Sequence, residues 1–188
     1  MNRLIQVEGL AIPLALANVD TDLIIPAAYL KTTGREGLGQ HAFEALRGTA
    51  GNPFEDPGFG GAPIIVALDN FGCGSSREHA AWALADLGIR VVIAPSFSDI
   101  FAGNALRNGI ATIELEREEV QRLLKAASAK AILTVDIDGL AVSTTRGDHF
   151  TFRMDPFRRA RLMSGQDDIA VTLASEPEIS AFEQRVSI

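Results

Sequence analysis

The sequence has a single cysteine, Cys73, and this scarcity excludes several kinds of site. One thiol cannot form a disulfide within the chain, and so low a cysteine content is typical of a reducing compartment. One thiol also cannot supply the several protein ligands that an iron–sulfur cluster or a cysteine-based zinc site requires. We therefore expect no self-contained metal centre of either kind in this chain.

Basic charge and long apolar stretches are missing as well. The formal net charge is −7 and the isoelectric point is about 4.9. This balance argues against a nucleic-acid partner, because phosphate binding needs a basic face. There is no run of roughly 20 apolar residues to span a membrane, and residues 1–8 lack the apolar stretch of a signal peptide. We therefore expect a cytoplasmic protein that binds neither nucleic acid nor membrane.

What the chain does have is the composition of a globular protein. Of its 188 residues, 47% are hydrophobic and 22% are charged. This balance is ordinary for a soluble protein and allows a sizeable core. The length fits one domain that spans residues 1–188.

The middle of the chain alternates between strand and helix patterns. Apolar runs at residues 64–68, 91–94 and 110–114 have the length and character of strands that are buried on both faces. Between them, residues 75–87 and 98–107 have helical spacing. Alternation of this kind predicts a parallel sheet with right-handed crossovers.

The segments that flank this unit have other textures. Residues 4–16 predict one or two short strands, and residues 40–47 predict a short helix. Beyond Lys130, short apolar runs separated by glycine turns predict hairpins. The elements expected after the third buried strand are an amphipathic helix at 116–129, strands at 131–136, 140–144 and 149–153, and helices at 156–164 and 177–185. The expected fold is α/β, with a mainly parallel central sheet, flanking helices and a small antiparallel annex.

The most informative stretch lies between the first buried strand of this sheet and the helix after it, and reads Asn-Phe-Gly-Cys-Gly-Ser-Ser-Arg-Glu-His-Ala. Gly72 and Gly74 let the backbone approach a ligand closely. The hydroxyls of Ser75 and Ser76 and the guanidinium of Arg77 gather at the predicted head of the helix, where the helix dipole favours an anion. This combination suits a small dicarboxylate. The alternative is that one serine merely caps the helix.

Two other interpretations of the same stretch are weaker. A dinucleotide-binding fingerprint needs a third glycine where this chain has Arg77, and the strand at 91–94 is not followed by the acidic residue that would hold a ribose. Cys73 could be a nucleophile, because a thiol beside a helix N-terminus can have a lowered pKa. However, His79 is predicted to lie on another side of the helix, so a small buried thiol is the better interpretation.

Together with three other segments, this stretch resembles a known family. Gly-x-Gly-Ser-Ser-Arg-Glu-His-Ala after a buried strand is similar to the signature of the swivelling domain of the aconitase superfamily. The segment Asp-Thr-Asp-Leu-Ile-Ile-Pro, which begins at Asp20, resembles the Asp-Thr-Asp-x-Ile-x-Pro motif of the small subunits of 3-isopropylmalate dehydratase. Further similar segments follow in family order over nearly the whole chain, at residues 96–101, Asn104, Asn108, Gly109, 165–169, Ile179, Phe182 and Glu183.

The resemblance implies a hydro-lyase that interconverts 2-isopropylmalate and 3-isopropylmalate by dehydration and rehydration, in leucine biosynthesis. It implies a 4Fe-4S cluster that is bound by cysteines of a large partner subunit, with no cofactor bound by this chain, and a small dicarboxylate substrate. By motif position, Ser75 would take the substrate proton as an alkoxide, and Ser76 and Arg77 would bind a carboxylate. Asp22 would orient a histidine of the partner, although without the family it equally fits a routine turn residue.

The resemblance also places substrate selection in the loop at residues 30–39, which contains three glycines. Thr32, Thr33 and Arg35 would bind substrate there, although Arg35 equally fits a solvated loop charge. The loop departs from the family pattern, with Glu36 in place of threonine and Leu38 in place of phenylalanine. Related acids such as citraconate, methylmalate or homoaconitate are therefore alternative substrates. A non-catalytic anion-binding module is the alternative from outside the enzymes.

Overall fold

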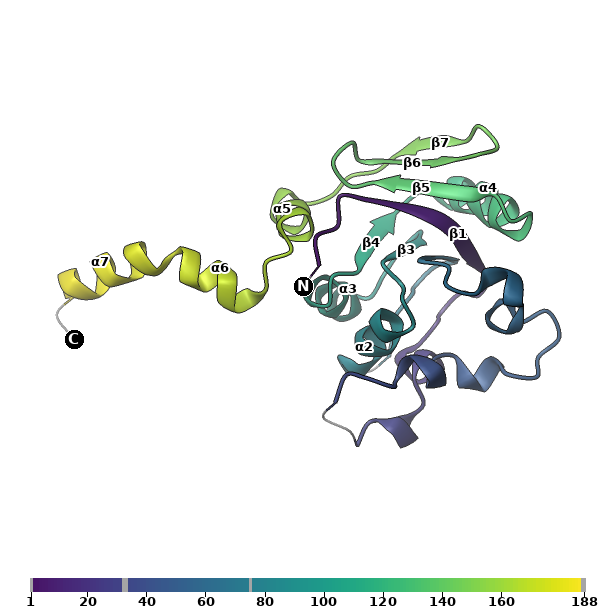
Figure 1. Ribbon diagram of the computed structural model, residues 1–188, viewed down its shortest axis with the longest axis horizontal. Coiled ribbons are helices and arrows are strands. Elements are labelled where there is room, and N and C mark those ends of the chain that lie inside the picture. The colour runs from purple at the N-terminus through teal and green to yellow at the C-terminus, as the bar shows by residue number, and fades with distance from the viewer. Residues whose placement is uncertain (1, 32–33, 75, 187–188) are drawn as a thin grey trace.

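The strand β1 (Gln6–Leu14) lies in the middle of a seven-stranded mixed sheet (Figure 1). The computed structural model describes residues 2–31, 34–74 and 76–186. The other strands are β2 (Ile64–Ala67), β3 (Val91–Ala94) and β4 (Ala111–Glu114) on one side of β1, and β5 (Ile132–Asp136), β6 (Ala141–Thr144) and β7 (His149–Thr151) on the other. The architecture is α/β, as the sequence predicts.

β1 joins a parallel half of the sheet to an antiparallel half. Its residues 11–14 pair in parallel with β2, and its residues 6–10 pair antiparallel with β5. Gly9 lies beside this change of partner, where a Cβ atom would come within 2.8 Å of the ring of Pro63. The predicted antiparallel annex is therefore continuous with the parallel sheet, through one strand that serves both.

Every side chain of β2 and β3 is buried. Their branched residues suit a pleated surface that is covered on both faces. β2 pairs in parallel with β1 and β3, and β3 pairs in parallel with β4, which confirms the predicted parallel sheet. Successive residues face opposite sides, so that Ile65 and Val92 join one apolar cluster while Ile64 and Val91 join the other.

Helices cover both clusters. α2 (His79–Asp86) and α3 (Asp99–Arg107) contribute Leu84 and Phe101 to the cluster that contains Ile65. On the other face, the amphipathic helix that the sequence predicts is present as α4, whose bounds are Arg117–Ser128. The candidate site described below lies on the side of α2 and α3.

α2 begins later than the sequence predicts. The spacing starts the helix at residue 75, whereas its first helical residue is His79 and its N-cap is Glu78. Gly72 and Gly74 have φ angles of 75° and 90°, in the left-handed region that favours glycine. The left-handed turn at these glycines therefore delays the helix, although the apolar spacing of the sequence fits a helix from residue 75 onward.

The segment between β1 and β2 consists of short turns. α1 (Thr21–Ile24) is a single turn whose N-cap, Asp20, accepts the N–H of Leu23. The 3-10 turns that follow are η1 (Ala27–Tyr29), η2 (Gly39–His41), η3 (Glu44–Leu46), η4 (Pro53–Glu55) and η5 (Pro57–Phe59). The short helix predicted at residues 40–47 is wrong, because Phe43 between η2 and η3 has a positive φ of 53°, which interrupts a helix.

Three helices follow the last strand. They are α5 (Pro156–Ser164), α6 (Asp168–Ala174) and α7 (Glu176–Val186). The helices predicted at 156–164 and 177–185 correspond to α5 and α7, whereas α6 is an element that the sequence analysis missed. α6 and α7 extend away from the sheet (Figure 1). Within the described residues, no helix has both the length and the apolar character to span a membrane.

A contact in the turns before β2 can be tested through Tyr29, the one tyrosine of the chain. Tyr29 stacks on His41, and its hydroxyl hydrogen-bonds to the carboxylate of Glu44. This hydrogen bond raises the pKa of the phenol, because ionisation would remove the donor and place a second negative charge beside the first. We expect Glu44→Gln to lower the pKa of Tyr29 toward its ordinary value, as measured by phenolate absorbance in an alkaline titration. Glu55→Gln is the control. If Glu44→Gln left the pKa of Tyr29 unchanged, the contact between Tyr29 and Glu44 would be contradicted.

Candidate active site

The candidate site lies at the carboxyl ends of the parallel strands β1, β2 and β3, the edge where ligands bind in many α/β sheets. We call residues 70–74 and 76–78, which lie between β2 and α2, the glycine turn. The N–H of Gly72 donates to the carbonyl of Val19 at 2.7 Å, and the N–H of Ser98 donates to the carbonyl of Phe71 at 3.0 Å. The glycine turn is therefore fixed between the segments that follow β1 and β3.

Two glycines set the path of the glycine turn. A Cβ atom on Gly72 would lie 2.1 Å from Cγ of Phe101 in α3, a distance that no side chain can occupy. A Cβ atom on Gly74 would lie 3.4 Å from that of Asp20, just before α1. The turn therefore passes directly over α3 and closes against the start of α1.

Two predicted site residues, Arg77 and Asp22, lie in direct contact. Nη1 of Arg77 donates to Oδ1 of Asp22 at 2.7 Å. Their side chains are 40% and 57% exposed. Because solvent screens an ion pair of this kind, it contributes only about 0–1 kcal/mol to stability. Each group can therefore exchange the other for a new charged partner at little cost, while the fold keeps both in place.

Ser76 is exposed and precedes Arg77 in the glycine turn. Glu78, and not Ser76, holds the N-cap position of α2, and no side-chain cap bond forms there. The capping interpretation is therefore wrong for Ser76, which is exposed and next to Arg77 in the chain. Three other predicted site residues, Thr32, Thr33 and Ser75, lie outside the described residues.

Arg35 lies against α2. Its guanidinium carbon is 5.1 Å from the ring centroid of Trp82, within the range of a cation–π contact. Further along the same loop, the N–H of Gly39 donates to Oδ2 of Asp86 at 2.7 Å, and a Cβ atom on Gly39 would meet the backbone of Leu87 at 2.5 Å. The part of the loop that the structure describes is therefore packed along the helix whose head carries Arg77, and Arg35 is exposed while its guanidinium contacts Trp82.

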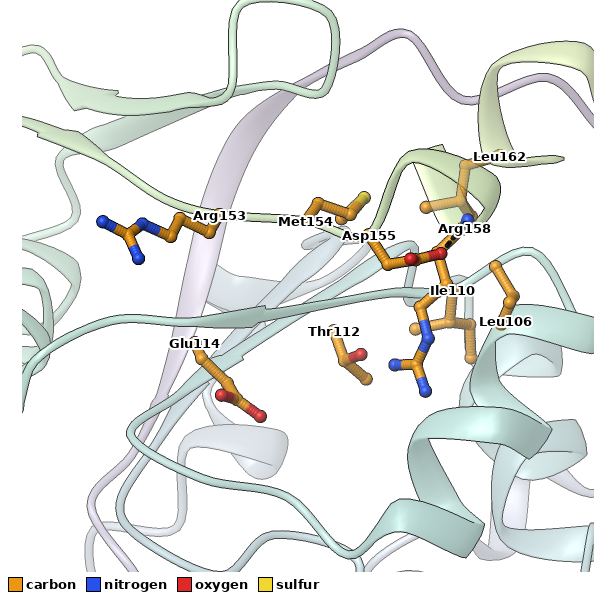
Figure 2. Close-up of a pocket in the computed structure, with 9 residues that line it drawn as sticks. All are labelled: Leu106, Ile110, Thr112, Glu114, Arg153, Met154, Asp155, Arg158 and Leu162. Atoms are coloured by element: carbon orange, nitrogen blue, oxygen red, sulfur yellow. Dashed lines mark hydrogen bonds between the residues drawn. The ribbon is translucent and has the colours of Figure 1, made fainter. Parts of the chain in front are cut away.

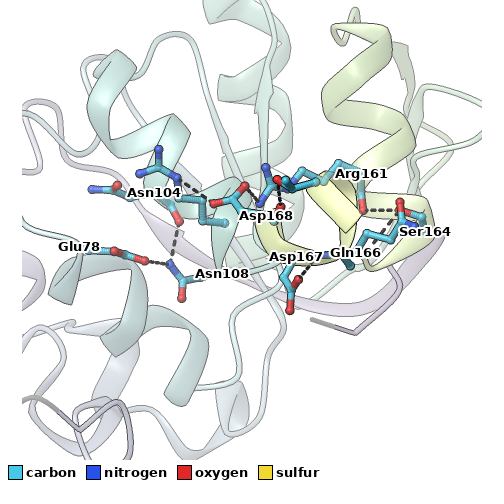
Figure 3. Close-up of polar contacts among 11 residues, drawn as sticks. Glu78, Asn104, Asn108, Arg161, Ser164, Gln166, Asp167 and Asp168 are labelled. Atoms are coloured by element: carbon cyan, nitrogen blue, oxygen red, sulfur yellow. Dashed lines mark hydrogen bonds and ion pairs between the residues drawn. The ribbon is translucent and has the colours of Figure 1, made fainter. Parts of the chain in front are cut away.

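The sequence analysis assigned no role to two asparagines of α3 and its C-cap that hold the glycine turn. Asn104 is buried, and its amide donates to the carbonyl of Ser76 at 3.4 Å. The amide of Asn108 donates to Oε1 of Glu78 at 2.9 Å and to the carbonyl of Asn104 at 2.8 Å (Figure 3). The available signal was their four-residue spacing, which puts both amides on the face of α3 that also carries the buried Phe101.

Cys73 is half-buried, and so more exposed than the buried thiol that the sequence predicts. Among the described residues, no group of three or more His, Cys, Asp or Glu side chains is placed to hold a metal ion. A 4Fe-4S cluster requires several thiolates, so the donor set of this chain does not fit one.

A separate cavity lies between β4, the end of α3 and α5 (Figure 2). Its lining mixes Glu114 and Asp155 with Arg153 and Arg158. Asp155 caps α5 by accepting the N–H of Arg158 at 3.0 Å, and the two arginine side chains point in different directions (Figure 2). None of the predicted site residues lines this cavity. Its charges are dispersed and partly engaged in capping, so we assign it to the packing of α5.

Comparison with known proteins agrees with the resemblance seen in the sequence. Residues 1–118 match the family model of the aconitase C-terminal domain. The chain is 54% identical over 185 residues to the 3-isopropylmalate dehydratase small subunit of Erythrobacter litoralis, covering 98% of this chain and 92% of that protein. It is 52% identical over 177 residues to the 3-isopropylmalate dehydratase small subunit of Zymomonas mobilis, covering 94% and 92%.

The fold has a counterpart among solved structures. A crystal structure of 3-isopropylmalate dehydratase from Methanocaldococcus jannaschii superposes with a TM-score of 0.71 at 29% identity, covering 95% of this chain and 99% of that one. Sequence identity near one half and a shared fold, each over nearly the full length, both lead to the same assignment. The chain belongs to the family of 3-isopropylmalate dehydratase small subunits, within the aconitase C-terminal domain family.

Proposed function

We propose that this chain works as the small subunit of a 3-isopropylmalate dehydratase, a hydro-lyase of leucine biosynthesis that interconverts 2-isopropylmalate and 3-isopropylmalate by removing and adding water. The relatives' name, small subunit, implies a large-subunit partner. The observation that carries the proposal is the contact between Arg77 and Asp22 at the end of a turn rich in glycine and serine. It gathers a carboxylate-binding group and an orienting carboxylate at one exposed edge of the sheet.

The large subunit completes the site in this proposal. It would hold a 4Fe-4S cluster, which would supply a Lewis acid toward the substrate hydroxyl. This division of labour agrees with the donor set of the small subunit, which has one cysteine. The small subunit then contributes the groups that bind the diacid and move its proton.

Arg77 is the proposed anchor for a substrate carboxylate, with the Ser76 hydroxyl beside it. Guanidinium presents parallel N–H donors that match the two oxygens of a carboxylate. When Arg77 turns from Asp22 to the substrate, it gives up a screened pair and gains a contact in a site that the partner covers. Asp22 is then free to accept a hydrogen bond from a histidine of the large subunit and to fix its orientation.

Ser75 is the proposed base that takes the proton from the substrate carbon. A serine hydroxyl is a very weak acid, so its alkoxide needs stabilisation by nearby positive charge and N–H donors. α2 begins only at His79, so Arg77 is the nearer source of positive charge along the chain. We therefore assign Arg77 a second task, which is to lower the pKa of Ser75 once the partner excludes water.

The loop that follows η1 is the proposed selector of substrate, with Thr32, Thr33 and Arg35 as its contacts. Arg35 is exposed, and its contact with the ring of Trp82 gives its charge a preferred place. This restraint distinguishes it from a loop arginine in solvent, whose side chain would have to be ordered on binding.

The function is tested by reconstitution. We expect this chain and a cysteine-rich large subunit, purified together under anaerobic conditions, to convert 2-isopropylmalate into 3-isopropylmalate and to prefer it over citraconate. Each subunit alone should be inactive in the same assay. Hydration by this chain alone would refute a shared site, and a pair that turned over citraconate but not isopropylmalate would move the protein to a related hydro-lyase.

The role of Ser75 predicts a large loss of turnover in the reconstituted pair. We expect Ser75→Ala to lower kcat by about 10²–10⁴-fold, which is the usual contribution of a general base. Binding of the large subunit and the visible absorbance of its cluster should be unchanged. Ser164→Ala, in α5, is the control. Normal turnover in Ser75→Ala would show that the base is another group.

The role of Arg77 predicts weaker substrate binding. We expect Arg77→Ala to raise KM on the order of 10–100-fold, since a charge-assisted hydrogen bond is worth about 1.5–3 kcal/mol. The same variant should also lower kcat, because Arg77 is proposed to stabilise the Ser75 alkoxide. The matched control is Arg117→Ala, because Arg117 forms a similarly exposed pair with Asp69 at 2.8 Å. Equal effects of the two variants would assign Arg77 to surface pairing and remove it from the substrate site.

A further inference from the structure

The segment 167–186, which we call the C-terminal arm, contains α6 and α7 and extends away from the sheet (Figure 1). Neither helix has a buried residue. Large apolar side chains are nevertheless exposed along the arm: Ile169, Leu173, Ile179, Phe182 and Val186. Exposed apolar side chains that are grouped in this way, in contrast to single ones, mark an interaction surface.

The apolar residues of the arm share helical faces. Ile179, Phe182 and Val186 have spacings of three and seven residues in α7, and Ile169 and Leu173 are four apart in α6. Helices as short as these are marginal in water by themselves, and they gain most of their stability by packing an amphipathic face. A short amphipathic helix in an apolar groove is a common mode of protein recognition.

The charge of the C-terminal arm indicates which kind of protein it can pack against. The arm has five acidic residues and one basic residue, a net charge of −4. A second copy of this chain would present the same acidic arm, so packing arm against arm would bring like charges together. The arm therefore suits a different protein, one with an apolar groove that is bordered by basic residues.

The root of the arm is fixed beside the candidate site. Asp168 lies 2.5 Å from Nη2 of Arg161 and 3.7 Å from Nε of Arg107 (Figure 3). Arg161 is buried, so this end of the arm has a defined position. Arg107 belongs to α3, between Asn104 and Asn108, which hold the glycine turn. A protein that covers the glycine turn therefore also comes within reach of the arm, whose helical length is on the order of 25–30 Å.

From these observations we infer that the C-terminal arm is a docking element for the large subunit. Its apolar face packs into a groove of that subunit, and its acidic residues pair with basic side chains along the groove. The arm and the glycine turn then engage the same partner from the two sides of α3. This inference rests on the proposed function, which supplies the large subunit as the partner.

The test uses the full chain with two substitutions on the apolar face, Ile179→Ala and Phe182→Ala together. Titration calorimetry with the purified large subunit measures the affinity, and we expect it to fall on the order of 10–100-fold, as for central interface residues. Phe157→Ala is the matched control, because Phe157 in α5 is 58% exposed and Phe182 is 57% exposed. The control should leave the affinity within about twofold of the unmodified chain, which is the usual size of a neutral truncation.

Turnover separates docking from catalysis. With the large subunit in excess of its new dissociation constant, the doubly substituted chain should recover the kcat of the unmodified pair. Unchanged affinity would overturn the inference. The inference would also be overturned if the substitutions abolished self-association in sedimentation equilibrium but left the affinity for the large subunit intact. The apolar surface would then bind a second copy of this chain. If the pair binds as expected but leaves isopropylmalate unchanged, the docking inference stands and the proposed substrate falls, so the two failures are distinguishable.

Discussion

The contact between Gly72 and the ring of Phe101 is the constraint on which the candidate site depends. The backbone at Gly72 approaches α3 so closely that a single added carbon atom would overlap the ring. A left-handed φ at the same residue turns the chain toward the segment after β1. The turn then ends where Arg77 reaches Asp22, although 55 positions separate the two residues in the sequence. The convergence of the site therefore follows from one close approach of backbone to side chain.

The site that results is well placed but open. Arg77 and Asp22 are each about half exposed, and water screens their attraction. A serine that acts as a base needs the opposite environment, because an alkoxide is stabilised by fixed charges only where water is excluded. The geometry of this chain is thus that of one wall of a site. In the proposed function, the large subunit that the relatives' name implies would cover this wall and strengthen each of its electrostatic interactions.

α3 contacts both the glycine turn of the candidate site and the root of the C-terminal arm. Asn104 and Asn108 hold the backbone of the glycine turn and the head of α2, while Arg107 contacts Asp168 at the root of the C-terminal arm. Because one rigid helix carries these contacts, the turn and the root of the arm have a fixed spacing. A partner that recognises the arm can therefore be set in register with the site before any substrate enters.

The sequence by itself determined those strands and helices that depend on the spacing of apolar residues within one short segment. The buried strands β2, β3 and β4 and the amphipathic helix α4 follow from the spacing of apolar residues, and the motif around Arg77 identified the family and the candidate site residues. Only the tertiary structure decided that α2 starts late and that Phe43, between η2 and η3, has a left-handed conformation. It alone also decided that β1 pairs with both the parallel and the antiparallel half of the sheet. It also decided that Arg77 meets Asp22 and that the amides of α3 hold the turn. These features depend on contacts between residues that are distant in the chain, and a local pattern carries no information about which distant residues will meet.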